Sequence, residues 1–125
     1  MNFKSIMALR DLVKPAYLQQ ATRSGKPIIL YFTGKWCVPC RIMKRTVWAD
    51  KHVSTSVNTQ FIPVQIQVDD PKDAEVLARY NVSGAPVTII ADPQGNVLRW
   101  REGGMGKVDF LEFIEELNQS TDIEL

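Results

Sequence analysis

The chain has 125 residues, of which 45% are hydrophobic and 23% charged, with a formal net charge of +1. This length and balance predict one soluble globular domain with enough apolar residues for a core. The small net charge gives no sign of a nucleic-acid partner, and the longest apolar runs have the length of strands, not of membrane spans.

Apolar periodicity and turn residues predict alternating helices and strands. In chain order we expect a helix over residues 15–23, a strand over 28–33, a helix over 37–49, a short helix or turn over 50–58, a strand over 61–68, a helix over 70–80, strands over 87–91 and 97–101, and a helix over 107–118. The last residues should form a flexible C-terminal tail.

The order of these elements predicts the architecture. Strands that are joined by helices should be parallel, whereas the last two strands are separated only by a turn and should form an antiparallel hairpin. The prediction is a three-layer α/β/α fold with a mixed central sheet. We expect a single domain over residues 1–125, with its core at about 15–118.

The predicted helix over residues 37–49 is amphipathic. Ile42, Met43 and Val47 are expected to face the core, with the basic residues around them more exposed. These basic residues are Lys35, Arg41, Lys44 and Arg45. They are either a solvated face or a surface with an electrostatic role, and the sequence leaves both open.

The only two cysteines, Cys37 and Cys40, lie between a predicted strand and a predicted helix. Residues three apart share one face of a helix, so the two thiols can form a disulfide. Cys37 would sit at the helix N-terminus, where free N–H groups favour the thiolate that attacks disulfides. Pro39 is tolerated there because the first turn has no helical acceptor to lose. We therefore expect Cys37 to be the attacking thiol and Cys40 the resolving thiol.

Two simpler interpretations of the cysteine pair fit less well. A zinc site needs four ligands, and the chain offers only one histidine, His52, and scattered carboxylates besides the cysteines. His52 follows a charged stretch and is expected at the surface. A purely structural disulfide would close too short a loop to stabilise much. We expect no metal.

Three features together resemble the thioredoxin family, over residues 15–118. They are Trp-Cys-Val-Pro-Cys at residues 36–40 after a strand, Gly-Ala-Pro at 84–86 before a strand, and the glycine pair 103–104 before the last helix. The resemblance implies the thioredoxin fold. It also implies that the bond before Pro86 is cis and that Pro86 faces the disulfide. A cis bond before proline is uncommon and usually has a specific structural role.

Within that superfamily the chain resembles the C-terminal, periplasmic domain of the membrane thiol:disulfide interchange proteins, most clearly at residues 24–30, 33–40 and 46–53. The resemblance implies a protein thiol-disulfide oxidoreductase that needs no cofactor beyond its own disulfide. It implies protein disulfide substrates and an upstream thiol reductant such as a membrane electron donor. We expect a monomer.

The expected substrate-binding residues surround the cysteine pair. Trp36 is an aromatic side chain in the loop beside the thiols, a common choice for a binding surface. The backbone of Ala85 and Pro86 is expected to align the partner chain as an added strand. Val38, Pro39 and Gly103 complete the expected groove.

The chain departs from the family at the position of its proton-relay acid. Thioredoxin has an acidic residue six positions before the first cysteine, where this chain has Tyr31, and Gln65 replaces its lysine partner. Many interchange relatives also have a glutamate where this chain has Lys44. Another group or a water molecule must therefore carry the proton to or from the resolving thiol, or turnover is slower.

Two further questions stay open in the sequence. The N-terminus has no apolar run long enough for a signal peptide, so we expect a cytoplasmic protein if the chain is complete and a periplasmic one if a signal or membrane segment has been removed. The alternative function is a thioredoxin-fold adaptor, whose cysteine pair senses redox state without efficient turnover.

Overall fold

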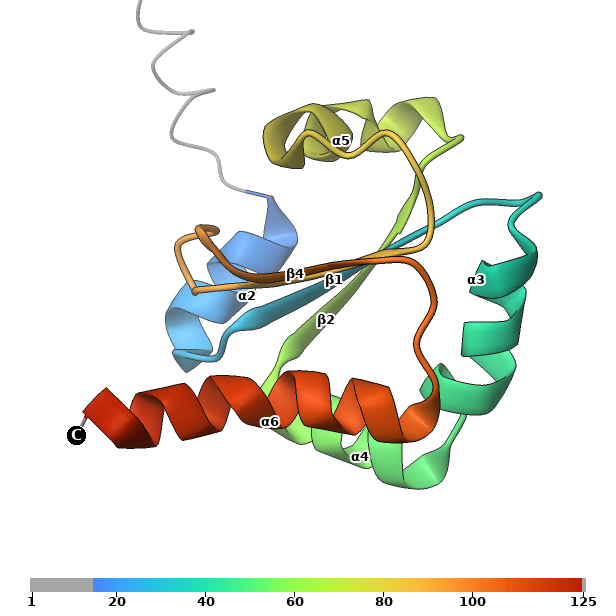
Figure 1. Cartoon of the computed structure of the whole chain (residues 1–125). Helices are drawn as coiled ribbons and strands as arrows, with labels where there is room; N and C mark the ends of the chain where they lie inside the picture. Colours follow the sequence, from blue (N-terminus) through green and yellow to red (C-terminus); the bar gives the residue numbers. More distant parts are fainter. Residues whose placement is uncertain (1–14, 125) are drawn as a thin grey trace, which may run out of the picture.

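The computed structural model of the chain describes residues 15–124 (Figure 1). In chain order its elements are α2 (Ala16–Ser24), β1 (Ile28–Thr33), α3 (Val38–Met43), η1 (Lys44–Trp48), α4 (Lys51–Gln60), β2 (Ile62–Gln67), η2 (Pro71–Asp73), α5 (Ala74–Tyr80), β3 (Val87–Ala91), β4 (Val97–Glu102) and α6 (Lys107–Glu124). This order confirms the predicted alternation of helices and strands.

The four strands form one sheet in the order β2-β1-β3-β4. Strand β1 pairs parallel with β2 and antiparallel with β3, and β3 pairs antiparallel with β4 across the turn that ends at Gly95. The mixed sheet and its final hairpin are therefore as predicted. The expectation that strands joined by helices are parallel holds for β1 and β2 but was wrong for β3, which follows β2 through α5 and runs antiparallel to β1. The central strand β1 is buried along its whole length, as expected of a strand covered on both faces.

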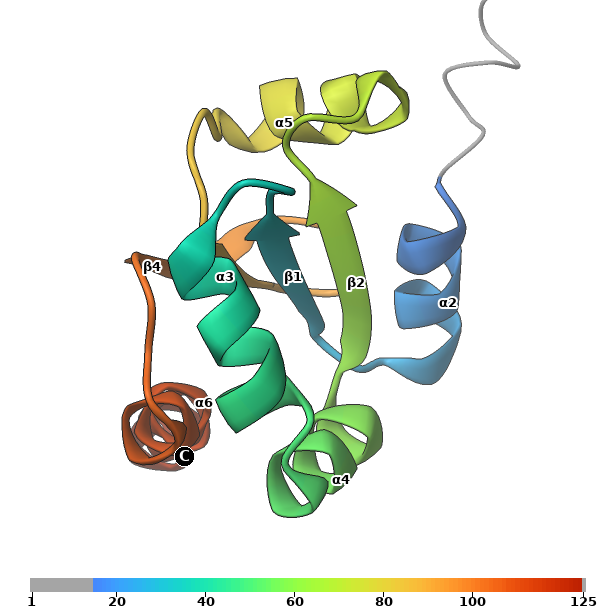
Figure 2. The same ribbon diagram turned by 90° about the vertical axis from the view of Figure 1, so that its right-hand side faces the viewer.

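Helices cover both faces of the sheet, so the three-layer prediction is confirmed. Alternate residues of β1 divide between two apolar clusters, with Leu30 in the cluster that α2 and α5 cover and Ile29 in the cluster that α3, η1, α4 and α6 cover. Figure 2 shows α3 and α2 on opposite sides of strands β1 and β2.

Side-chain caps begin several of these helices. The carboxylate of Asp50 accepts the N–H of Val53 at 3.0 Å at the start of α4. The carboxylate of Asp70 accepts the N–H of Lys72 at 3.0 Å at the start of η2, where Pro71 occupies the first turn. Within residues 15–124, no helix combines the length and the apolar character that a membrane span requires.

Two predictions about helices were wrong in detail. Helix α6 continues to Glu124 instead of ending at residue 118, because residues 119–124 contain no glycine or proline to stop it. The helix after Cys37 changes from an α-helix to the π-helical turn η1, in which the N–H of Ala49 reaches the carbonyl of Lys44 at 3.0 Å.

Ile42 was also wrongly placed in the core. The buried stripe of this helix is Cys40, Met43 and Val47, which are at most 1% exposed and follow the spacing of one helical face. Ile42 lies beside that stripe, and 46% of its surface is exposed.

Candidate functional site

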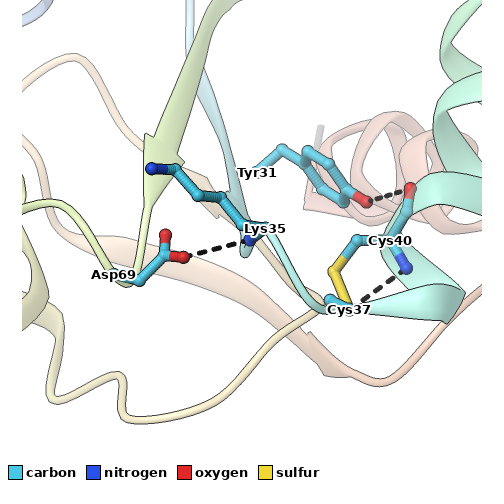
Figure 3. Close-up of a disulfide and its surroundings, with 5 residues drawn as sticks. All are labelled: Tyr31, Lys35, Cys37, Cys40 and Asp69. Carbon is cyan, nitrogen blue, oxygen red and sulfur yellow. Dashed lines mark hydrogen bonds between the residues drawn. A yellow bond between two sulfur atoms is a disulfide. The ribbon is translucent and has the colours of Figure 1, made fainter.

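The candidate site is a disulfide between Cys37 and Cys40 at the start of α3 (Figure 3). Strand β1 ends at Thr33, and a short loop brings Cys37 to the position immediately before the helix. The Cα atoms of the two cysteines are 5.2 Å apart, which is within the usual range for a disulfide. The predicted pairing of the two thiols on one helical turn is thus confirmed.

The two sulfur atoms have different surroundings. The Sγ of Cys37 accepts the backbone N–H of Cys40 at 3.2 Å, and Cys37 is a partly exposed residue. Cys40 is completely buried. A charge on Cys37 would be stabilised by this N–H and by the helix N-terminus, because both present positive partial charge to an anion.

Tyr31 lies beneath the disulfide, in the position where thioredoxin has its acid. Its hydroxyl donates a hydrogen bond of 3.2 Å to the carbonyl oxygen of Cys40 (Figure 3). Its ring packs against Trp48 with centroids 4.9 Å apart, and Trp48 in turn packs on Phe110 at 5.0 Å. Burial raises the pKa of Tyr31, an effect that the side chains of Thr33 and Trp48 partly oppose. The residue is therefore neutral at physiological pH.

We call α3 and its continuation η1 the redox helix. A cavity of about 210 Å³ opens beside Tyr31, between the redox helix and the edge strand β2. Gln65 lies directly opposite Tyr31 in the parallel register, and both line the cavity together with Lys44. Among the described residues that line it, Lys44 is the one charged group. The acid-lysine pair expected from thioredoxin is therefore replaced by a neutral phenol, an amide and a nearby lysine.

Two buried hydroxyls near Tyr31 were missed by the sequence analysis. Thr33 and Thr88 are both fully buried, and neither hydroxyl has a hydrogen-bond partner among the described residues. Thr33 follows Tyr31 by two residues, and Thr88 is opposite Tyr31 in the antiparallel register, so all three side chains point to the face that α3 covers. The signal was present in the sequence as two polar residues within strands that are otherwise apolar.

The bond between Ala85 and Pro86 is cis, as the resemblance implied. Pro86 is buried, and its carbonyl accepts the N–H of Gly103 at 2.9 Å. Gly103 has a φ of +89°, a conformation that favours glycine. A methyl group added to Gly104 would lie 3.8 Å from the Cβ of Pro39. These contacts bring all three predicted motifs to the same end of the sheet.

The other predicted site residues divide between two surfaces. Trp36 is 89% exposed in the loop before Cys37, and Val38 and Pro39 are exposed on the first turn of α3. Ala85 and Pro86 instead line a hollow of about 280 Å³ with Gly103, to which neither Trp36 nor Val38 contributes. Within residues 15–124 no three histidine, cysteine or acidic side chains gather as a metal site would require, and His52 is exposed.

Comparisons with known proteins agree with this geometry. A family model described as a thioredoxin-like domain matches residues 15–118. The thiol:disulfide interchange protein DsbD of Ralstonia nicotianae is 32% identical over 80 residues, which cover 63% of this chain and 13% of that protein. DsbD of Yersinia pestis (strain Pestoides F) is 29% identical over 117 residues, which cover 91% of this chain and 19% of that protein. The chain thus spans less than a fifth of the length of these relatives.

Solved structures give the same fold. A thioredoxin from Thermus thermophilus superimposes with a TM-score of 0.73 at 25% identity, over 82% of each chain. The C-terminal domain of DsbD from Neisseria meningitidis in its oxidised form gives a TM-score of 0.70 at 23% identity, over 89% of this chain and 94% of that one. The expected thioredoxin fold is therefore confirmed.

Proposed function

The chain belongs to the thioredoxin-like domain family, and we propose that it serves as a protein disulfide reductase or electron carrier. Its reaction class is thiol-disulfide oxidoreduction, and its redox group is the Cys37–Cys40 disulfide. What we propose beyond this class is the direction of electron flow, from the protein's dithiol to a partner's disulfide. It is supported by the similarity to the DsbD proteins, which are thiol:disulfide interchange proteins by name.

In the proposed reaction, the Cys37 thiolate attacks one sulfur of a partner's disulfide. A bond forms between Cys37 and that sulfur, and the other partner sulfur leaves as a thiolate that takes up a proton. The Cys40 thiol then loses its proton to water and attacks the Sγ of Cys37. This step releases the second partner thiol and closes the Cys37–Cys40 disulfide. The partner has gained two electrons and two protons, and an upstream dithiol restores the reduced protein.

One observation carries the assignment of the two roles. Cys37 is partly exposed and accepts an N–H at the helix N-terminus, whereas Cys40 is fully buried one turn into the helix. An attacking thiol must reach the partner and must ionise readily, and Cys37 meets both requirements. A resolving thiol needs to reach only Cys37, so burial does not hinder Cys40.

We further propose that the partner chain binds as an added strand beside Ala85 and Pro86. The carbonyl of Pro86 is already bonded to Gly103, while the backbone of Ala85 has no such partner among the described residues. Free backbone groups beside a strand end are what an extended peptide needs for pairing. Trp36, Val38 and Pro39 would contact the partner's side chains near its disulfide.

The proposed partners follow from the relatives. Proteins that carry disulfides would be the substrates, and a thiol reductant, such as the membrane electron donor that the resemblance implies, would supply the electrons. If the chain works as the interchange proteins' C-terminal domain does, its location is the periplasm. This proposal rests on the family resemblance and not on any feature of residues 15–124.

The adaptor alternative is favoured by one observation. Tyr31 is neutral in the position of the acid that moves protons for the resolving thiol in thioredoxin, so turnover has lost that route. Reduction of insulin by dithiothreitol, followed by turbidity, separates the alternatives. The proposed oxidoreductase should accelerate precipitation, and Cys37→Ala should abolish the acceleration. An adaptor would leave the uncatalysed rate unchanged.

The equilibrium with glutathione tests the direction of electron flow. A reduction potential near the roughly −270 mV of thioredoxin supports a reductant, whereas a value near −120 mV would indicate an oxidant. Turnover combined with a strongly oxidising potential would keep the reaction class and overturn the proposed direction.

A further inference from the structure

The segment around the disulfide is more basic than the rest of the chain. Residues 34–49 contain four cations, Lys35, Arg41, Lys44 and Arg45, and no acidic residue. The whole chain has a formal net charge of +1, so everything outside this segment has a net charge of −3. Positive charge is therefore concentrated at the reactive end of the molecule.

Exposed apolar side chains lie among these cations. Trp36, Val38 and Ile42 are exposed by 89%, 54% and 46%, and all three fall within seven residues of sequence. Val38 and Ile42 are four residues apart on one side of the redox helix. Single exposed apolar residues are ordinary, but a group of three beside a reactive disulfide is typical of a contact surface.

The arginines of this segment have no acidic partner in the part of the chain that the structure describes. Among the described residues, Arg41 and Arg45 form no ion pair, although they are four residues apart on an exposed helical face. They line a hollow of about 520 Å³ with Val38, Ile42 and Lys44. The backbone N–H of Lys35 donates a hydrogen bond to the carboxylate of Asp69 at 3.2 Å, so an acidic residue lies next to Lys35 (Figure 3).

We propose that a basic docking face, formed by Trp36, Val38, Arg41, Ile42 and Arg45, selects partner proteins that carry acidic side chains and an apolar residue next to their reactive disulfide. This inference deepens the proposed function and rests on it. Arginine suits the role because its planar guanidinium binds carboxylates through two parallel hydrogen bonds. The apolar residues provide the dry centre of the contact, and the arginines its charged rim.

A protein partner fits this face better than an anionic polymer or lipid surface. The cations surround a disulfide whose chemistry requires another sulfur, and the apolar centre is as prominent as the charge. Attraction between opposite charges mainly increases the rate of association. Salt screens this attraction, and at 0.1 M ionic strength it is largely lost beyond about 10 Å. The docking face should therefore affect the rate constants for reaction with charged partners and the dependence of these rate constants on salt.

The experiment uses the full chain in its reduced form and three peptide disulfides. The peptides share a leucine beside a single cysteine that is linked to 2-mercaptoethanol, and they differ only in three flanking residues, which are glutamate, glutamine or lysine. The rate constant for oxidation of the protein is measured at low and at high salt. We expect the glutamate peptide to react roughly tenfold faster than the glutamine peptide at low salt, with the lysine peptide slowest. High salt should remove most of the difference.

Two double variants locate the preference. Arg41→Glu with Arg45→Glu should abolish or reverse it. Lys51→Glu with Arg79→Glu makes the same change in net charge at two exposed residues outside the docking face, and it should leave most of the preference in place. The ratio of rates between peptides is compared within each protein, so a change in the reactivity of Cys37 itself cancels.

The uncharged bis(2-hydroxyethyl) disulfide tests the oxidoreductase function separately from the docking face. If the wild-type protein does not reduce it, the proposed oxidoreductase function fails. If it reduces this compound but treats the three peptides alike, or if both double variants lose the preference equally, the docking face is overturned and the function stands. Binding to vesicles that contain phosphatidylserine, without any preference among the peptides, would also overturn the inference, because it would assign the face to a lipid surface.

Discussion

The hydroxyl of Tyr31 donates a hydrogen bond of 3.2 Å to the carbonyl oxygen of Cys40, and this bond ties the central strand to the redox helix. The contact occupies the place where thioredoxin has a carboxylate. Since burial raises the pKa of Tyr31, the group remains a neutral donor over the physiological range. It holds the helix in place without adding a negative charge near the two sulfurs.

Replacing Tyr31 with phenylalanine removes this hydrogen bond, together with the hydroxyl's contacts with the side chains of Thr33 and Trp48. The Cys40 carbonyl keeps the N–H of Lys44, so we expect a loss of about 1 kcal/mol in the free energy of unfolding, measured with urea. The pKa of Cys37 should not change, because one neutral side chain replaces another. Tyr80→Phe is a matched control, since Tyr80 donates a similar bond of 3.0 Å to the carbonyl of Gly95. A shifted thiol pKa in Tyr31→Phe alone would contradict the neutral role of Tyr31.

Brief treatment of the reduced protein with iodoacetamide should modify Cys37 and spare Cys40. Cys37 is partly exposed at the helix N-terminus, whereas Cys40 is completely buried. Mass spectrometry of the digested protein locates the label. Equal labelling of the two cysteines in the folded protein would contradict the difference in reactivity.

The pKa of Cys37 should lie below that of an unperturbed thiol. The N–H of Cys40 points at its sulfur, and the acids found in relatives are replaced by a neutral tyrosine and by Lys44. Tyr31→Asp combined with Lys44→Glu adds negative charge near the sulfur and should raise this pKa, as followed by the ultraviolet absorbance of the thiolate. Lys51→Glu is the control for a distant change of charge. A double variant with a lower pKa than the wild type would contradict the electrostatic argument.

Stability should fall at alkaline pH because of a second buried tyrosine. Burial first, and then the neighbouring Tyr17, raise the pKa of Tyr80 from 10.0 to about 12. Between these values the unfolded chain has lost the phenolic proton and the folded protein has kept it, so the free energy of unfolding decreases as pH rises through this window. Below the window the contribution is complete.

Urea unfolding of the oxidised protein at several pH values tests this expectation. Tyr80→Phe should be less stable at neutral pH, because it loses the bond to Gly95, but its stability should depend less steeply on alkaline pH. Tyr31 contributes a slope of the same sign, so some dependence should remain in the variant. Identical slopes in the two proteins would show that Tyr80 does not hold its proton more tightly when folded.

Much of the fold and of the site could be predicted because local chemistry determines it. The continuous apolar run at residues 28–33 and the Asp-Pro start of η2 gave nearly the observed bounds. The disulfide and the cis bond before Pro86 followed from two short motifs and the family resemblance. These features depend on residues that are close together in sequence.

The features that sequence analysis missed depend on packing between distant elements. The orientation of Ile42 is set by the stripe of Cys40, Met43 and Val47 that faces the sheet, and by the π-helical turn that follows. The proximity of Thr88 to Tyr31 depends on the register of β3 against β1. The spacing of the stripe can be read from its own segment, but the face that the sheet covers cannot, and the register of β3 against β1 cannot be read from one segment either.

The most direct test of the account is the trapping of partners by single cysteine variants. Cys40→Ala keeps the attacking thiol and removes the resolving one, so partners should accumulate as mixed disulfides on Cys37. Non-reducing gels of the variant, expressed as the full chain, should show adducts of high mass that disappear with dithiothreitol, and Cys37→Ala should show none. Adducts on Cys37→Ala and none on Cys40→Ala would contradict the assigned order of attack and resolution.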